Sequence, residues 1–216
     1  MTRTRAKICG IRDRDDLELA VKAGADAVGL LCSVPIDSPR EIPLDRARRL
    51  VEATPPFVTA VLVTMPADLA TARELVETVR PDAIQCHGDL APAAVASLAA
   101  DLPTIMAVEA TDEEAIARYR EHADALLLDS TDDAGAGGTG TTHDWDRARS
   151  IVADLSIPVI LAGGLTPENV ERAIEVVEPY AVDVASGVDG SDGKDPEAVR
   201  EFLAGVRAGA RGRVQP

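Results

Sequence analysis

Long apolar runs are absent from this sequence of 216 residues. A helix that crosses a membrane needs about 20 consecutive apolar residues, and no run approaches that length. The N-terminus is basic, with Arg3, Arg5 and Lys7, but it has neither the apolar stretch nor the small-residue cleavage site of a secretory signal. We therefore expect a cytoplasmic protein with no membrane partner.

Cysteine is scarce: the chain has only Cys9, Cys32 and Cys86, and no C-x-x-C spacing. Three thiols cannot all pair, and in a cytoplasmic chain we interpret them as reduced. A zinc site formed by these cysteines and His87 is an alternative. It is disfavoured because the separations are wide and irregular, and because Cys86 and His87 are neighbours, which point to opposite faces of a strand. We predict no metal site.

Lysine is scarcer than the size of the chain suggests, with only Lys7, Lys22 and Lys194. The 37 acidic residues outnumber the 22 basic ones, and the net charge is −15. Such a surface argues against nonspecific nucleic-acid binding, which depends on Lys and Arg contacts to phosphate. Because the acids are scattered, they indicate a solvated surface, and adaptation to high salt is a hypothesis that follows from their mutual repulsion.

Short runs of Val, Ile, Ala and Leu alternate with segments of helical period along the whole chain. Asp13 and Gly24 suit the cap and the stop of the first predicted helix, and Thr166 and Pro167 suit the cap and first position of the seventh. No change of composition divides the chain, so we predict one domain, residues 1–216. The predicted strands are 6–9, 25–31, 57–63, 82–85, 104–108, 125–128, 159–162 and 181–185, and the helices are 13–23, 43–53, 67–79, 91–99, 112–119, 145–153, 167–177 and 196–207.

Eight apolar strands that alternate with helices indicate a parallel sheet covered by helices. An open doubly wound sheet is the main rival, but it usually has a glycine-rich phosphate loop after its first strand. Here that turn reads "CGIRD", and the glycine-rich loops follow strands six, seven and eight. A (β/α)8 barrel commonly binds phosphate after strands seven and eight, so the sequence predicts this barrel, although the chain is short for it.

The active sites of such barrels lie at the carboxyl ends of the strands, where "LAGGLTPENV" and "VASGVDGSDGKD" occur. Glycine lets the backbone approach an anion, and a helix N-terminus adds a favourable dipole. We therefore interpret Gly163, Gly164, Ser186 and Gly187 as phosphate-binding, against the alternative that they form tight turns. "GAGGTGTT" is either a further phosphate contact or a flexible loop.

Two strand ends carry candidates for acid and base chemistry. Asp129 follows three leucines in "ALLLDS", and partial burial of a carboxylate favours the protonated form that a general acid needs. The alternative is that it caps the next loop. Cys9 is either a small hydrophobic residue at the end of a strand or a working thiol, and its position alone favours the first.

Other polar residues at strand ends also have two interpretations. His87 in "IQCHGD" binds substrate or caps its loop, and Arg40 in "SPREI" recognises a carboxylate or lies in solvent. Asp183 is an acid inside an apolar strand and should need a partner there, so we predict that it supports the site.

Taken together, these motifs resemble the phosphoribosylanthranilate isomerase family of tryptophan biosynthesis. The resemblance covers nearly the whole chain and rests on "KICGI", "GADAVG", "SPR", "HGD", "LLLD", "GGTG…DW", "AGGLTPENV" and "AVDVASGV", which occur in the family's order. It implies a single-domain (β/α)8 barrel, without a cofactor, that acts on a phosphosugar as a monomer or homodimer. The reaction is an Amadori rearrangement of N-(5-phosphoribosyl)anthranilate.

The resemblance also implies a role for each candidate residue. Cys9 matches the family's general base and Asp129 its general acid; Lys7 can assist the thiol if it faces the same side. The other matches are Arg40 with the substrate carboxylate, His87 and Asp183 with the lining of the site, and Gly138, Gly140, Gly163, Gly164, Ser186 and Gly187 with the phosphate contacts.

The chain departs from the family in three motifs. Thr141 stands where many relatives have lysine, and Cys86 replaces a leucine. The usual S-S-G-V-E reads Ala185-Ser186-Gly187-Val188-Asp189, which keeps the phosphate turn but shortens the acid. The rival functions are another phosphosugar enzyme, such as an indole-glycerol-phosphate synthase or a histidine-pathway isomerase, and a binding protein without turnover. The strand-one cysteine and the absence of a half-barrel repeat disfavour the histidine-pathway isomerase, and the retention of both Cys9 and Asp129 disfavours the binding protein.

Overall fold

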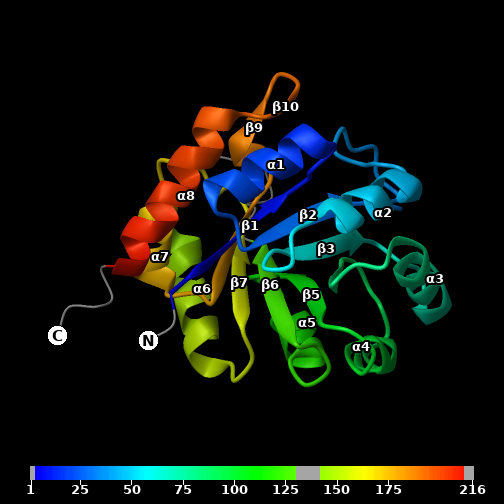
Figure 1. The fold of residues 1–216 in the computed structure, drawn as a ribbon. Coiled ribbons are helices and arrows are strands. Elements are labelled where there is room, and N and C mark those ends of the chain that lie inside the picture. Colours follow the sequence, from blue (N-terminus) through cyan, green and yellow to red (C-terminus); the bar gives the residue numbers. More distant parts are fainter. Residues whose placement is uncertain (1–2, 130–141, 212–216) are drawn as a thin grey trace.

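Eight parallel strands form a closed barrel in chain order, in which β1 pairs with both β2 and β8. The computed structural model describes residues 3–129 and 142–211 (Figure 1). Closure of the sheet confirms the predicted (β/α)8 barrel and excludes the open sheet, whose edge strands stay unpaired. The strands are β1 (Arg5–Cys9), β2 (Ala27–Leu31), β3 (Thr59–Thr64), β4 (Ala83–Cys86), β5 (Thr104–Glu109), β6 (Ala125–Asp129), β7 (Val159–Ala162) and β8 (Ala181–Val184).

A helix follows every barrel strand and lies on the outside of the sheet (Figure 1). None of the helices among residues 3–129 and 142–211 has the length and apolar character needed to cross a membrane. The helices are α1 (Arg14–Ala23), α2 (Leu44–Ala53), α3 (Leu69–Val79), α4 (Pro92–Ala99), α5 (Glu113–Tyr119), α6 (Thr142–Asp154), α7 (Val170–Val177) and α8 (Pro196–Arg211).

The first helix shows why the local sequence predicts these elements well. The Asp13 side chain accepts a hydrogen bond from the Asp16 backbone N–H, which lacks a partner within the helix. Gly24 ends the helix in the left-handed region, with φ of 97°, where a side chain would be strained. Both residues therefore have the capping roles that the sequence predicts.

The predicted start of the seventh helix is wrong. α7 begins at Val170 with Asn169 as its cap, rather than at Pro167 with Thr166 as the cap. The Asn169 side chain accepts from the Thr166 N–H (2.8 Å) and donates to the Gly164 carbonyl (2.9 Å). These two bonds make residues 167–169 a turn that belongs to the glycine loop, and the helix begins only after it.

Strand side chains alternate between the barrel interior and the surrounding helices. Cys9 packs inside the barrel with Val61 and Val63, whereas Cys32 and Cys86 belong to the large cluster between the sheet and the helices. Each large aliphatic side chain buried in that cluster stabilises the fold by about 1.5–3 kcal/mol. Alternation thus gives Cys9 a different environment from the other two thiols.

A short hairpin interrupts the connection between β8 and α8. After one turn of 3-10 helix, Ser186–Val188, the antiparallel strands β9 (Asp189–Gly190) and β10 (Gly193–Lys194) pair beside α1. The Lys194 N–H donates to Oδ1 of Asp16 (2.7 Å), and the Arg12 N–H donates to Oδ2 of the same carboxylate (3.0 Å). Asp16 therefore fastens the hairpin to the loop that follows β1.

Candidate active site

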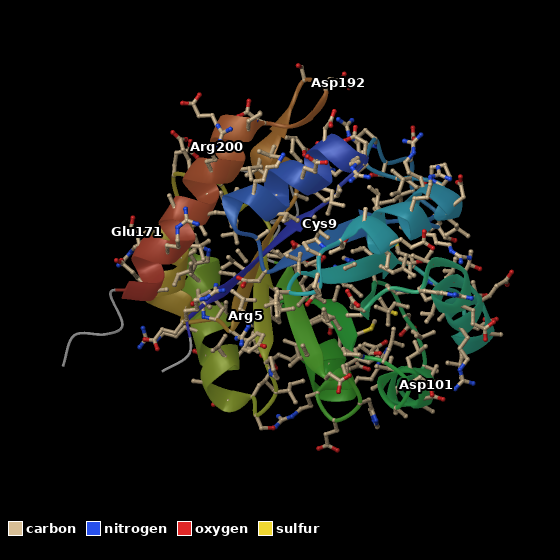
Figure 2. All side chains as sticks on the ribbon, viewed as in Figure 1. Arg5, Cys9, Asp101, Glu171, Asp192 and Arg200 are labelled. Atoms are coloured by element: carbon tan, nitrogen blue, oxygen red, sulfur yellow. The ribbon has the colours of Figure 1, made fainter. Side chains whose placement is uncertain are left out.

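The carboxyl ends of the strands surround a cavity of about 250 Å³. All of the predicted site residues that the structure describes line it, from the ends of six strands and the loops that follow them. Cys9 lies near the centre of the molecule in Figure 2, while charged residues such as Asp101 and Asp192 lie at its periphery. Gly138 and Gly140, and also Thr141, fall outside the described residues. The predicted residues that line the cavity are Cys9, Arg40, His87, Asp129, Gly163, Gly164, Asp183, Ser186 and Gly187.

Cys9 shares the floor of the cavity with a buried ion pair. Lys7 precedes it by two residues on β1 and so faces the same side, as alternation permits. The Lys7 Nζ lies 2.9 Å from Oδ1 of Asp183 on β8, and the two residues are only 3% and 8% exposed. Asp183 therefore has the buried partner that the sequence predicts an acid at this position to need.

The protonation of the three thiols follows from their surroundings. Burial raises the pKa of the Cys9 thiol above its ordinary value; Lys7 opposes this rise, Asp183 adds to it, and Lys194 opposes it. Burial raises the pKa of both Cys32 and Cys86 to about 12. Of the three thiols, Cys9 is thus the one on which nearby ammonium groups act to favour the thiolate.

Lys7 keeps its proton although it is buried. Burial favours the neutral amine, but the facing Asp183 carboxylate and the Cys9 thiol outweigh it and raise the pKa of Lys7 above its ordinary value. A permanent positive charge therefore lies beneath the cavity.

His87 reaches the cavity from the end of β4, as predicted. Burial and the nearby Lys7 lower the pKa of His87, so its ring is neutral near pH 7. Its Nε2 lies 2.8 Å from Nε2 of Gln85, which is 1% exposed. The Gln85 amide donates to the neutral ring and fixes its orientation over the cavity.

Asp129 ends β6, where its backbone pairs with Ala162 of β7 and Glu109 of β5. It also borders a second, larger cavity of about 510 Å³ that shares Asp129 and His87 with the first and extends over β4 and β5 toward α5. Asp129 therefore borders two neighbouring spaces at the mouth of the barrel.

The two predicted phosphate loops lie against each other. Gly163 and Gly164 both have positive φ, 81° and 61°, which strongly favours glycine. A Cβ at Gly187 would lie 2.0 Å from the Leu165 carbonyl oxygen, so only glycine fits there. Lys194 Nζ donates to the Ala185 carbonyl (2.9 Å) and so supports the second loop from below.

Arg40 crosses the mouth of the cavity directly above the β1 loop. A Cβ at Gly10 would lie 2.5 Å from Cδ of Arg40, which shows how closely the arginine stem passes over the backbone. The guanidinium is held by Asp189, whose other oxygen binds Lys194 at 2.5 Å. Arg40 is only part-exposed and is paired with Asp189, which disfavours the alternative that it lies free in solvent.

Four further polar residues support the site although the sequence analysis assigns them no role there: Gln85, Asn169, Asp189 and Lys194. Lysine usage carries a signal for the last of them. In a chain with three lysines, Lys7 and Lys194 are 3% and 6% exposed, whereas Lys22 lies on the surface. Lysine is rarely buried without a partner, so two buried lysines in a chain with so few indicate a specific need for positive charge at these positions.

The cavity contains the groups that proton transfer needs. Among the described side chains, no group of three His, Cys, Asp or Glu residues is arranged to hold a metal ion. Cys9 lies inside the barrel and the other two thiols outside it, so they cannot share a zinc ion with His87. A thiol and a carboxyl group that line one space between two glycine loops can transfer protons to and from a bound substrate.

Comparison with known proteins gives a consistent result. The family model described as N-(5'phosphoribosyl)anthranilate (PRA) isomerase matches residues 6–204. The N-(5'-phosphoribosyl)anthranilate isomerase of Natronomonas pharaonis is 56% identical over 201 residues, which cover 93% of this chain and 96% of the relative. That of Haloferax volcanii is 54% identical, over 98% of this chain and 96% of the relative.

Solved structures are also similar to this chain, at lower sequence identity. The crystal structure of phosphoribosyl anthranilate isomerase from Thermotoga maritima is 36% identical, with a TM-score of 0.84 over 94% of this chain and 98% of that one. A crystal structure of the isomerase in complex with reduced 1-(o-carboxyphenylamino)-1-deoxyribulose 5-phosphate is 33% identical, with a TM-score of 0.80 over 94% and 98%.

Proposed function

The chain belongs to the phosphoribosylanthranilate isomerase family, and from this premise we propose that Cys9 and Asp129 are the general base and the general acid of its reaction. The activity is an aldose–ketose isomerisation in tryptophan biosynthesis, in which N-(5'-phosphoribosyl)anthranilate becomes 1-(2-carboxyphenylamino)-1-deoxyribulose 5-phosphate. The observation that carries the assignment is the single cavity lined by the Cys9 thiol, the Asp129 carboxyl group and both glycine loops.

Asp129 begins the reaction by protonating the furanose ring oxygen. The bond between that oxygen and C1 breaks, and the nitrogen lone pair forms the C1=N bond of a cationic Schiff base. A carboxyl group at the mouth of the barrel suits this step because it can deliver its proton to a substrate that enters from solvent.

Cys9 then removes the proton from C2. The C2–H electron pair forms a C1=C2 double bond, the C1=N pair returns to nitrogen, and the resulting enolamine tautomerises to the ketone. The thiolate is the basic form, and burial disfavours it in the empty site. The positive charge of the Schiff base favours loss of the thiol proton to water, which leaves the thiolate that accepts the C2 proton.

The remaining polar groups hold the substrate. The backbone N–H groups of the Gly163-Gly164 and Ser186-Gly187 loops suit the phosphate, and the Arg40 guanidinium suits the anthranilate carboxylate through paired hydrogen bonds. His87 and Asp183 line the cavity between these two ends. Contacts at both ends of the substrate fix C2 beside Cys9.

We further propose that the chain acts in the cytoplasm as a monomer or homodimer, with no nucleic-acid partner. The solved structures include monomers generated from the dimeric isomerase of Thermotoga maritima, 32% identical to this chain. The net charge of −15 supports the absence of nucleic acid. Light scattering of the purified protein tests the oligomeric state, and a tetramer would contradict the proposal.

Turnover of phosphoribosylanthranilate by Cys9→Ser and Asp129→Asn tests the catalytic assignment. Loss of a general acid or base should lower kcat by about 10²–10⁴-fold. Cys32→Ala, which removes a thiol from the helix-facing cluster, is the matched control and should keep the wild-type kcat. Unchanged kcat in both Cys9→Ser and Asp129→Asn would refute the assignment.

A further inference from the structure

The buried Lys7–Asp183 pair has no task in the proton transfers described above. Lys7 and Asp183 are register partners on β1 and β8, and Asp183 lines the cavity. Removing both charges from water costs free energy that an apolar pair of similar volume would not cost. The position of this pair beneath the reacting groups therefore calls for a functional explanation.

The ammonium group and the thiol share one space beside Gly29. Gly29 is the β2 register partner of Cys9, and a Cβ there would lie 2.7 Å from Cys9 Sγ and 3.1 Å from Lys7 Cε. The absent side chain leaves room for both. The Lys7 stem therefore passes beside the same space as the Cys9 sulfur, and its Nζ lies 2.9 Å from Asp183.

We propose that Lys7, held in place by Asp183, stabilises the thiolate of Cys9 and is thereby a positioning residue for the base. The inference rests on the proposed function, because it takes Cys9 as the group that accepts the C2 proton. When the proton moves, the C2–H bond breaks and an S–H bond forms, while Lys7 keeps its own proton. The enzyme thus holds a fixed positive charge beside the sulfur before and after the transfer.

The other charged groups around Cys9 do not replace Lys7. Lys194 of β10 also favours the thiolate, but it contributes less than Lys7 and its Nζ is engaged by the Ala185 carbonyl and Asp189. Asp183 disfavours the thiolate, and its direct contact with Lys7 offsets part of that effect. His87 is neutral, Asp129 lies across the cavity, and Arg40 is bound to Asp189 at its mouth.

The rate of Cys9 alkylation by iodoacetamide as a function of pH, measured without substrate, tests the proposal directly. The background is Cys32→Ala/Cys86→Ala, in which Cys9 is the single thiol of the chain. Lys7→Met, nearly isosteric and uncharged, should move the midpoint of the profile upward by about 1–3 pH units. Below the midpoint, the rate should then fall about tenfold for each unit of that shift.

Lys7→Arg is the matched control because it keeps the charge but is the larger change in shape. If the charge matters, the arginine variant should react more like the wild type than the methionine variant does, in both alkylation and turnover. If Lys7 only fills space, the methionine variant should be the closer match, and that result would overturn the proposal.

Loss of one partner can destabilise the fold, so Lys7→Met/Asp183→Asn provides a second route. This variant leaves no unpaired buried carboxylate, and its midpoint should still lie above that of the wild type. A wild-type midpoint in this folded double variant would also overturn the inference. Cys9→Ser distinguishes a failure of the proposed base from a failure of the inference about Lys7. If Cys9→Ser retains full turnover, the proposed base is wrong, whatever Lys7 does to the thiol.

Discussion

Arg40 and Asp189 join the loops on either side of β1 at the barrel mouth, with Arg40 Nε and Nη2 lying 2.7 Å and 2.6 Å from the same Asp189 oxygen. Arg40 follows β2, whereas Asp189 follows the phosphate loop after β8. Through its second oxygen Asp189 also binds Lys194, which holds the Ala185 carbonyl. The group proposed to bind the substrate carboxylate is therefore coupled to the loop proposed to bind its phosphate.

Replacing Asp189 by asparagine should weaken substrate binding more than it slows the chemistry. The substitution removes the charge that orients both Arg40 and Lys194, and a partly exposed ion pair of this kind contributes about 1 kcal/mol. We expect KM to rise about three- to tenfold with kcat within about twofold of wild type. Steady-state kinetics measures both constants, and Asp192→Asn at the exposed hairpin tip is the control. A lower KM would instead mean that Asp189 competes with the substrate for Arg40.

The two helix-facing thiols should make stability fall at alkaline pH. In the folded protein Cys32 and Cys86 stay protonated up to a pKa of about 12, whereas in the unfolded chain they ionise above about 8.5. A pKa raised by folding gives stability that is fully present below about pH 8.5 and is lost as the pH rises toward 12. The two thiols together should lower the free energy of unfolding by about 4 kcal/mol between pH 8 and 10.

Urea unfolding at several pH values, with Cys32→Ala/Cys86→Ala as the comparison, isolates this contribution. All other titrating groups are common to both proteins, so they cancel in the difference. The variant should be the less stable protein at pH 8, because it loses buried volume, and its disadvantage should shrink by pH 10. A difference that does not change with pH would show that the thiols are not the cause.

High salt should stabilise the protein. A net charge of −15 destabilises the compact state through repulsion, and the screening length falls from about 10 Å at 0.1 M salt to about 3 Å at 1 M. This expectation fits the haloarchaeal origin of the two relatives described above. We expect Tm to rise between 0.1 M and 2 M KCl, by about 2–4 °C for each kcal/mol gained.

The matched comparison for the salt experiment removes charge without changing shape. Glu77, Glu121 and Glu201 are all exposed, and their joint replacement by glutamine should raise Tm in dilute buffer and reduce the gain from KCl. If wild-type Tm falls as KCl is added, repulsion among the acids does not limit the stability of the fold.

Local patterns predicted most of the fold because barrel strands and helices have short, strongly periodic signatures. Asp13 and Gly24 bound α1 as predicted, since a cap and a left-handed glycine act within one turn. Asn169 shows where local patterns fail to predict the start of a helix. Its side chain bonds to a glycine loop formed by tertiary structure, and this delays α7 by three residues relative to the prediction from Pro167.

The sequence predicts the positions of those site residues that follow from the alternation of side chains along a strand and from the ends of the strands. Cys9, Asp129 and Asp183 lie where alternation and barrel geometry require. The positions of Lys194 and Asp189 could not be predicted in the same way. They lie on a short hairpin whose two strands have two residues each and no apolar pattern. Their contacts depend on the distances between loops, which the sequence pattern does not encode.

Replacing Gly187 by alanine should damage the phosphate loop while leaving the acid and base in place. The added Cβ would lie 2.0 Å from the Leu165 carbonyl oxygen, and since that atom belongs to the backbone, one of the two loops must move. Overpacking of this kind costs about 1–3 kcal/mol, which corresponds to about a 5- to 150-fold loss of affinity where the loop binds phosphate. We expect KM to rise and ribose 5-phosphate to inhibit less well, with a smaller change in kcat. Gly190→Ala is the matched control, because a Cβ there would lie an ordinary 3.5 Å from Asp195. Equal KM values for the two alanine variants would show that the Ser186-Gly187 turn does not bind the phosphate.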